Sequence, residues 1–132
     1  MRYSSPATGS TFKHPVDMLS ISPHHRFHLY SVPTDMRKSF DGLSGLIQNN
    51  LGGNPRSGDV FIFINKTRDK IKLLHWQGAG YTLYYKRLES GRFELPEYQE
   101  VEGSISINYA QIVMIVDGLS IKNIQHRKRY AS

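Results

Sequence analysis

Two neighbouring segments of this chain have lysine or tyrosine at alternate positions, a pattern suited to binding phosphate groups. A strand over residues 69–76 would place Lys70 and Lys72 on one face, and a strand over residues 81–88 would place Tyr84 and Lys86 on one face. If these four side chains share the outer face of one sheet, they form a basic surface with an aromatic ring in it. Ammonium groups contact phosphates, and the ring can stack on a base. The alternative is a solvated sheet face, whose lysines keep the protein soluble and discourage edge pairing.

Further basic residues extend this prediction. Arg37 and Lys38 fall in a predicted first helical turn, where the positive end of the helix dipole does not favour cations. They join the basic surface or act with other arginines, unless they are ordinary exposed helix residues. The basic run at residues 127–129 supplies nonspecific attraction to DNA, unless it is only a solvated end. The predicted nucleic-acid-binding residues are Arg37, Lys38, Lys70, Lys72, Tyr84, Lys86, Arg87 and Arg92.

Aromatic residues in the same region support a second hypothesis, docking on a protein. Trp76, Tyr81 and Tyr85, with Tyr84 beside them, form an aromatic set of the kind enriched at the centres of protein interfaces. A place in the core is the alternative explanation for Trp76. The sequence leaves both explanations open.

Enzyme chemistry has little support in the residue pattern. A phosphoryl-transfer enzyme needs several carboxylates that converge on divalent metal ions. Asp35 is better explained by helix capping, and Asp59 and Asp69 by turns at strand ends. The sequence has no cysteine, and acidic or thiol partners at metal-ligand spacing are missing around His24, His25 and His28. We therefore predict that the chain is not an enzyme and holds neither a cofactor nor a metal ion.

Length, composition and charge bound the class of protein. At 132 residues and 39% hydrophobic content, one domain with one core is expected. No apolar run is longer than that at residues 60–64, which is far shorter than the ~20 residues of a membrane helix. No apolar leader follows Met1, so a cytoplasmic protein is expected. Formal charge is +2 over residues 1–55, +5 over 56–92, −5 over 93–117 and +4 over 118–132. The basic middle would attract polyanions, unless it pairs with the acidic block.

Two helices are predicted from caps and apolar periodicity. The first covers residues 35–51, with Thr34 as its N-cap and the breaker run 52–55 after it. Its core stripe is Met36, Phe40, Leu43, Ile47 and Leu51. The second covers residues 109–117, with Asn108 and Gln111 as a capping box.

Strands are predicted over residues 26–31, 59–65, 69–76 and 81–88, with Ile105 and Ile107 in an edge strand. Their short connections favour an antiparallel arrangement. The predicted fold class is therefore α+β, a single domain in which an antiparallel β-meander packs with two helices.

Several stretches of the sequence together resemble a known family. They are the Pro-Thr-Asp-Met-Arg-Lys-Ser-Phe-Asp-Gly-Leu run at 33–43, the strand 58–65, the segments 72–76 and 80–81, and the run 85–93. The likeness is specific because two long motifs, residues 33–43 and 85–93, occur at the expected separation. It departs at Gln77, where the family often has Asp, and at Leu95, where Trp is frequent. The chain resembles the TnpB-type accessory proteins of the insertion-sequence-66 family, which are encoded beside the transposase in bacterial mobile elements.

The resemblance implies a non-catalytic accessory role in DNA transposition of an insertion sequence. It covers residues 21–121 and leaves a mobile N-terminal arm at 1–20 and a basic tail at 122–132. The implied mechanism is binding, and the predicted basic sheet face makes element DNA the first candidate partner. The alternative is a protein–protein interaction module that docks on the transposase or another accessory protein without touching DNA. No membrane and no small-molecule substrate are expected as partners.

Overall fold

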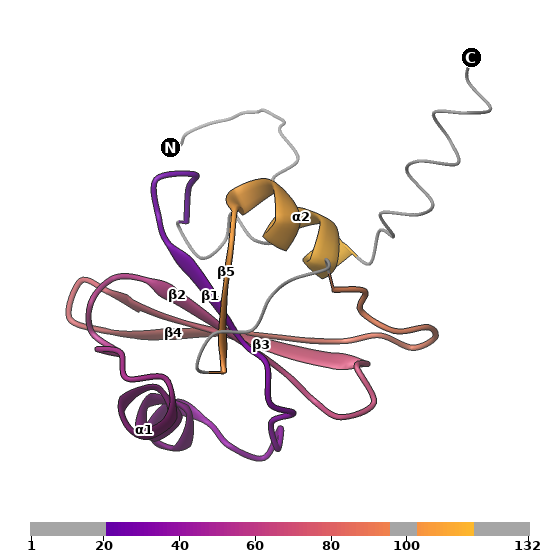
Figure 1. Ribbon diagram of the computed structural model, residues 1–132, viewed down its shortest axis with the longest axis horizontal. Helices are drawn as coiled ribbons and strands as arrows, with labels where there is room; N and C mark the ends of the chain where they lie inside the picture. Colours follow the sequence, from indigo (N-terminus) through magenta and orange to yellow (C-terminus); the bar gives the residue numbers. More distant parts are fainter. Residues whose placement is uncertain (1–20, 96–102, 118–132) are drawn as a thin grey trace, which may run out of the picture.

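The computed structural model describes residues 21–95 and 103–117, and these fold into one sheet and two helices (Figure 1). The predicted arm at 1–20 and tail at 122–132 lie outside the described residues. In chain order the elements are β1 (Phe27–Tyr30), α1 (Phe40–Asn50), β2 (Val60–Ile64), β3 (Lys70–Gln77), β4 (Gly80–Arg87), β5 (Ser104–Ile107) and α2 (Tyr109–Asp117). The predicted α+β fold is confirmed.

The sheet has the strand order β4-β3-β2-β1-β5. Strands β2, β3 and β4 form the predicted antiparallel meander, and β5 is an edge strand that pairs antiparallel with β1. In contrast to a pure meander, β1 and β2 are parallel, with Phe27 opposite Val60. The reason is the connection between them, because parallel neighbours need a crossover and here the crossover contains α1.

The two helices cover opposite faces of the sheet (Figure 1). Leu43 and Ile47 of α1 pack with Phe61, Phe63 and other residues of one face. The other face holds the larger cluster, in which residues of α2 pack on apolar side chains from β1, β2, β3 and β5. Because both of its faces are covered, β2 is buried along its whole length.

Helix α1 begins at Phe40, five residues later than predicted. Thr34 does not cap it, since its N–H donates to Ile64 O at 2.9 Å and its hydroxyl donates to Val32 O at 3.3 Å. The chain there is tied to the end of β2 and cannot start a helix. Met36 therefore precedes the helix, and Phe40 is 43% exposed instead of lying in the core stripe.

The ends of the helices otherwise follow the sequence signals. Beyond Asn50 the chain turns at Gly52, whose φ of 65° is the left-handed conformation that glycine adopts without strain. At α2, the side chains of Asn108 and Gln111 each accept a hydrogen bond from the other's backbone N–H, at 2.8 and 2.9 Å. The predicted capping box is confirmed.

Candidate nucleic-acid interface

The four residues predicted to share one basic sheet face lie on two faces. Strand pairing places Lys70 opposite Arg87 and Lys72 opposite Tyr85, on the face that carries α1. Tyr84 stands opposite Leu73, on the face that carries α2, and Lys86 shares that face. The predicted single face is therefore wrong. The two-residue turn between β3 and β4 sets this pairing, because it puts residues of opposite parity across from one another.

Lys72 is a buried lysine, only 6% exposed, instead of a surface cation. Its Nζ donates to Met36 O at 2.8 Å and to Lys38 O at 2.7 Å, and lies 4.6 Å from the centroid of the Tyr85 ring. The ammonium therefore fastens the segment before α1 to the sheet. Its bonds to two carbonyls and its contact with the ring compensate for the loss of water.

Lys86 and Tyr84 are also engaged within the fold. Lys86 Nζ donates to Val116 O at 2.6 Å, so its charge lies at the C-terminal end of α2, where the helix dipole favours a cation. Tyr84 packs partly buried against the core on the same side. Burial, together with the charge of Asp117, raises the pKa of the Tyr84 hydroxyl.

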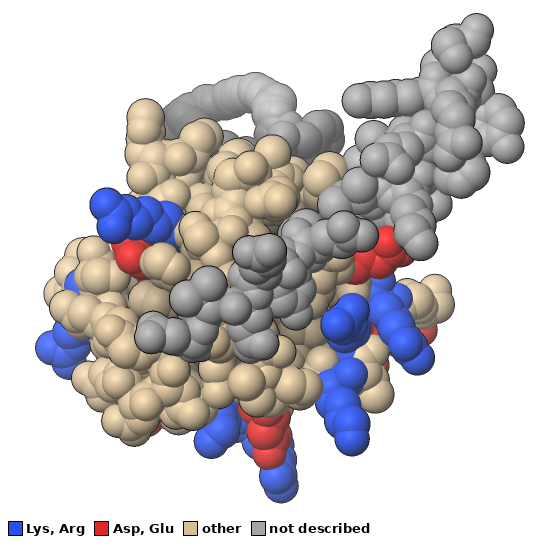
Figure 2. Space-filling view, viewed as in Figure 1, with Lys and Arg blue, Asp and Glu red and all other residues tan. Residues whose placement is uncertain are grey.

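Basic residues instead gather at one end of the sheet. Parallel β1 and β2 both end here, β3 begins here and β4 ends here, so four connecting segments meet. Figure 2 shows Lys and Arg side chains along the lower and right-hand border of the molecule, with a few acidic groups between them. We call the following seven residues the basic end: Arg37, Lys38, Lys66, Arg68, Lys70, Arg87 and Arg92. The acidic residues of the same segments number four, Asp35, Asp69, Glu89 and Glu94, which leaves an excess of three positive charges.

Three of these cations form ion pairs. Arg37 contacts Asp35 at 2.6 Å, Arg87 contacts Glu89 at 2.9 Å, and Lys70 lies 3.5 Å from Asp69. The Arg37 bonds lower the pKa of the Asp35 carboxyl to about 2. Within the described part of the chain, no carboxylate pairs with the other four, which are Lys38, Lys66, Arg68 and Arg92.

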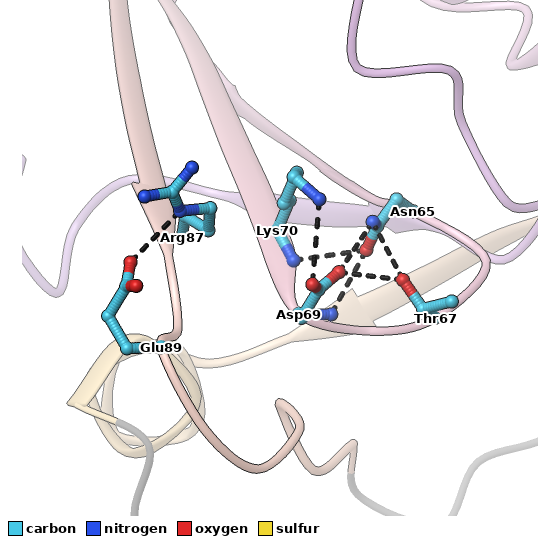
Figure 3. A network of polar contacts seen from close by, with 6 residues as sticks. All are labelled: Asn65, Thr67, Asp69, Lys70, Arg87 and Glu89. Carbon is cyan, nitrogen blue, oxygen red and sulfur yellow. Dashed lines mark hydrogen bonds and ion pairs between the residues drawn. The ribbon is translucent and has the colours of Figure 1, made fainter.

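A hydrogen-bond network makes the turn between β2 and β3 rigid (Figure 3). The Asp69 carboxylate accepts bonds from Thr67 Oγ1 and Asn65 Nδ2, both at 2.7 Å. The Asn65 side-chain oxygen accepts from the backbone N–H groups of Asp69 and Lys70. The bonds from Thr67 and Asn65 lower the pKa of Asp69 to about 2. The network therefore fixes the backbone from which the exposed side chains of Lys66 and Arg68 project.

Lys66 and Arg68 are candidate site residues that were not among the predicted ones, and both lie in the turn between β2 and β3. Arg68 has a φ of 59°, a left-handed conformation that glycine and asparagine adopt far more readily than arginine. Its carbonyl accepts a bond from Phe93 N–H at 2.6 Å, which brings Arg92 beside the turn. The sequence signal was two cations in a tight turn where glycine or asparagine is usual.

A groove of about 630 Å³ opens between the segment before α1 and the turn that follows β2. Arg37 and Asp35 lie on one side of it, and Lys66 and Lys70 on the other. Tyr85, which is 50% exposed, also lines it. The groove therefore combines three cations and one carboxylate with an accessible aromatic ring.

The three aromatic residues predicted to bind a protein do not gather in one place. Trp76 and Tyr81 stack edge to face, with ring centroids 4.9 Å apart, and the Arg56 guanidinium lies 4.7 Å from the Trp76 ring centroid. They stand opposite each other beside the β3–β4 turn. Tyr85 is four residues along β4, about 13 Å away, near the basic end.

His25 and His28 contact other side chains of the fold. His28 Nε2 lies 2.8 Å from Asp59 Oδ2, and the His25 ring packs edge to face on His75. No group of three potential metal ligands occurs among the residues that the structure describes. Within the same residues, no helix is long and apolar enough to cross a membrane.

Known relatives cover most of the chain. It is 29% identical to the uncharacterized protein y4jC of Sinorhizobium fredii (strain NBRC 101917 / NGR234) over 110 residues, which are 83% of this chain and 92% of the relative. It is 31% identical to the uncharacterized protein y4hO of the same strain over 112 residues, covering 85% of this chain and 96% of that protein. No solved structure matches the chain.

The sequence also matches a protein family over residues 25–126, which include every described element. That family comprises the IS66 Orf2-like proteins, of the TnpB type associated with insertion sequences. The match includes both motifs on which the resemblance rests, residues 33–43 and 85–93. This chain belongs to the IS66 Orf2-like family of insertion-sequence accessory proteins.

Proposed function

We propose that the protein assists transposition of its insertion sequence by binding element DNA through the basic end. Arg68 carries the proposal. It is exposed, has no carboxylate partner among the described residues, and holds a left-handed backbone that costs about 1 kcal/mol in a residue other than glycine. Such a cost is retained where the side chain has a task, and contact with a phosphate is the task that suits this cation.

The cations of the basic end come from separate segments, so they are spread over a surface and can contact several phosphates of one polyanion. Arg37 and Lys38 precede α1, Lys66 and Arg68 are in the β2–β3 turn, and Arg92 follows β4. Each phosphate that these groups neutralise releases condensed counterions, so affinity falls with salt concentration in proportion to the number of contacts. Lys72 and Lys86, which bond to backbone carbonyls, contribute to the fold and not to this surface.

The proposal is tested with fluorescently labelled DNA from the ends of the element, supplied as duplex and as separated strands. Arg68→Gly removes one cation and at the same time relieves the backbone, so DNA affinity falls several-fold while the midpoint of urea unfolding stays the same or rises. Arg68→Gly combined with Arg92→Ala lowers the steepness of the salt dependence by about two phosphate contacts. A loss of binding with intact or improved stability separates the role of the side chain from its effect on folding.

Arg26→Ala is the matched control. Arg26 is an exposed cation just before β1, at the opposite end of the sheet. Its removal changes net charge by the same amount and is expected to leave affinity within about twofold. If neither form of DNA binds, or if Arg68→Gly and Arg26→Ala behave alike, the basic end is not a DNA interface.

We also propose that the protein is not a nuclease. At the basic end, Asp35, Asp69 and Glu89 each bond to side chains of their own segment, and do not point together toward one metal position. Incubation of element-end DNA with the purified protein and Mg²⁺ or Mn²⁺ is expected to leave the DNA intact. Cleavage that scales with protein concentration and survives further purification would contradict this.

A second candidate function, docking on the transposase or another element-encoded protein, is favoured by one observation. Arg56, Trp76 and Tyr81 stack together at the end of the sheet away from the basic end, and these three residue types dominate binding energy in many interfaces. A pull-down from cells carrying the whole element, with and without nuclease, tests it. Nuclease-resistant capture that Trp76→Ala abolishes supports docking, and capture lost on nuclease treatment excludes it.

A further inference from the structure

The groove at the basic end has the features of a site for one unstacked nucleotide. Its lining includes Arg37 and Asp35 from the segment before α1, Lys66 and Lys70 from the region of the β2–β3 turn, and Tyr85 from β4. Its volume of about 630 Å³ falls within the range of pockets that hold molecules of nucleotide size. The cations can contact the phosphate of a nucleotide while the aromatic ring stacks on the base of the same nucleotide.

The Tyr85 ring is held in position before any ligand arrives. Lys72 Nζ lies 4.6 Å from the ring centroid, on one side of the ring, and is itself fixed by its bonds to Met36 O and Lys38 O. The residue is nevertheless 50% exposed, so the ring remains accessible from the groove. A half-exposed ring that rests on a buried ammonium is a ready stacking surface, because little side-chain freedom is lost on binding.

A base within a duplex cannot use this ring. Its two faces are occupied by neighbouring base pairs, and its edges, not its faces, are turned to the grooves. A base in a single strand exposes its faces, and its phosphates can reach the cations at the rim of the groove. We infer that the groove binds an unpaired nucleotide by stacking it on Tyr85, and that the protein prefers single-stranded DNA to duplex.

This inference rests on the proposed function, since it specifies the form of DNA that the basic end binds. It assigns different tasks to neighbouring residues. Lys66, Lys70 and Arg37 attract the phosphates of either form, whereas Tyr85 distinguishes a base with a free face from one in a duplex. Lys72 is a positioning residue, because it orients Tyr85 and the Arg37 segment without reaching the groove itself.

The test compares three labelled probes by fluorescence anisotropy at one salt concentration. They are an oligodeoxythymidine of about 12 nucleotides, the same strand annealed to its complement, and a strand of the same length built of abasic sites. The abasic strand keeps the phosphates and removes the bases. The wild-type protein is expected to bind the oligodeoxythymidine about 10-fold more tightly than either of the other probes, which is the ratio for about one stacked base.

The matched variants are Tyr85→Phe and Tyr85→Leu. Phenylalanine keeps the ring and should keep the preference, whereas leucine should erase it by weakening the oligodeoxythymidine alone. Because the comparison is between probes on the same protein, a partial change of fold in Tyr85→Leu lowers all three affinities together and does not imitate this result. Circular dichroism and the unfolding midpoint check that both variants are folded.

The outcomes separate the two proposals. Equal binding of the three probes, with the loss expected for Arg68→Gly, overturns single-strand recognition and keeps the basic end as a DNA interface. A preference for the oligodeoxythymidine that survives Tyr85→Leu overturns the role of Tyr85. Absence of binding to any probe overturns the proposed function itself.

Discussion

The Lys72 ammonium lies 4.6 Å from the centroid of the Tyr85 ring, and the two residues stand directly opposite each other on β3 and β4. Lys72 is buried and Tyr85 is half exposed, although basic and aromatic residues recur along both strands of this hairpin. The same ammonium reaches Met36 and Lys38, more than thirty residues earlier in the chain. The pair thus joins the interior of the sheet to the surface of the groove.

Lys72→Met should lower the free energy of unfolding by about 1–3 kcal/mol, because the carbonyls of Met36 and Lys38 lose their donor while the apolar stem is kept. Urea unfolding monitored by circular dichroism measures the effect. Lys38→Met, which removes an exposed side chain and keeps the Lys38 carbonyl, is the control and should change stability by under about 0.5 kcal/mol. Equal stability of the two variants would show that the bonds of Lys72 are not important.

Lys86→Met should loosen α2 in particular. The variant removes the donor to Val116 O and the positive charge at the end of the helix, together worth about 1–2 kcal/mol. Hydrogen exchange of the amides in α2 is expected to accelerate more than that of β2, which is buried in the centre of the sheet. Uniform acceleration across both elements would mean that Lys86 acts on global stability and not on the attachment of the helix.

Gly45→Ala should raise the free energy of unfolding by about 0.5–1 kcal/mol. Gly45 lies inside α1, and a Cβ there would meet no atom within 4 Å, so the new methyl costs no packing. Gly42→Ala is the comparison, since its Cβ would stand 3.1 Å from Lys38 Cβ and should gain less. Thermal unfolding of the two variants measures the difference, and a loss of stability at Gly45 would exclude an open surface around this helix position.

Acid should weaken the fold through Asp69. Its pKa falls from 3.8 in the unfolded chain to about 2 in the folded one, so the ionised form favours folding. That contribution is fully present above about pH 4 and is lost as the pH falls toward 2. The urea midpoint of the wild type should therefore decline over this range, and that of Asp69→Asn should decline less.

The Asp35 carboxyl, whose pKa is also about 2 because of Arg37, titrates over the same range. The double variant Asp35→Asn with Asp69→Asn should therefore show the smallest decline of all. If Asp69→Asn follows the wild-type curve in parallel, the network of the β2–β3 turn does not stabilise the fold through this charge.

Much of the fold is encoded locally and could be predicted from the sequence. The start of α2 follows from Asn108 and Gln111, whose mutual bonds span only three residues, and its core-facing side follows from an apolar stripe. Strands β2, β3 and β4 follow from alternation and short turns, and the end of α1 follows from Gly52. These signals are reliable because each depends on neighbours in the chain.

The start of α1, and the sheet face on which each basic or aromatic side chain lies, depended on contacts between distant segments. Thr34 has the chemistry of a cap, but the backbone bond from Thr34 to Ile64 holds it in the loop. Which of the predicted cations reach the surface depended on pairing between strands and on distant backbone carbonyls, Met36 O for Lys72 and Val116 O for Lys86. Lys66 and Arg68 could not be predicted because the pattern of a turn indicates its shape and not what its cations face.

The sequence by itself determined the family, the fold class, most of the elements and the concentration of charge in residues 56–92, since all of these are properties of composition and local pattern. The tertiary structure alone decided what each cation does. It buried Lys72 beneath Tyr85, placed Lys86 at the end of α2, and brought Arg37, Lys66 and Arg92 to one end of the sheet. The physical reason is that a lysine has the same charge everywhere, and its partners, which lie far away in the chain, determine whether that charge stabilises the fold or remains available to a ligand.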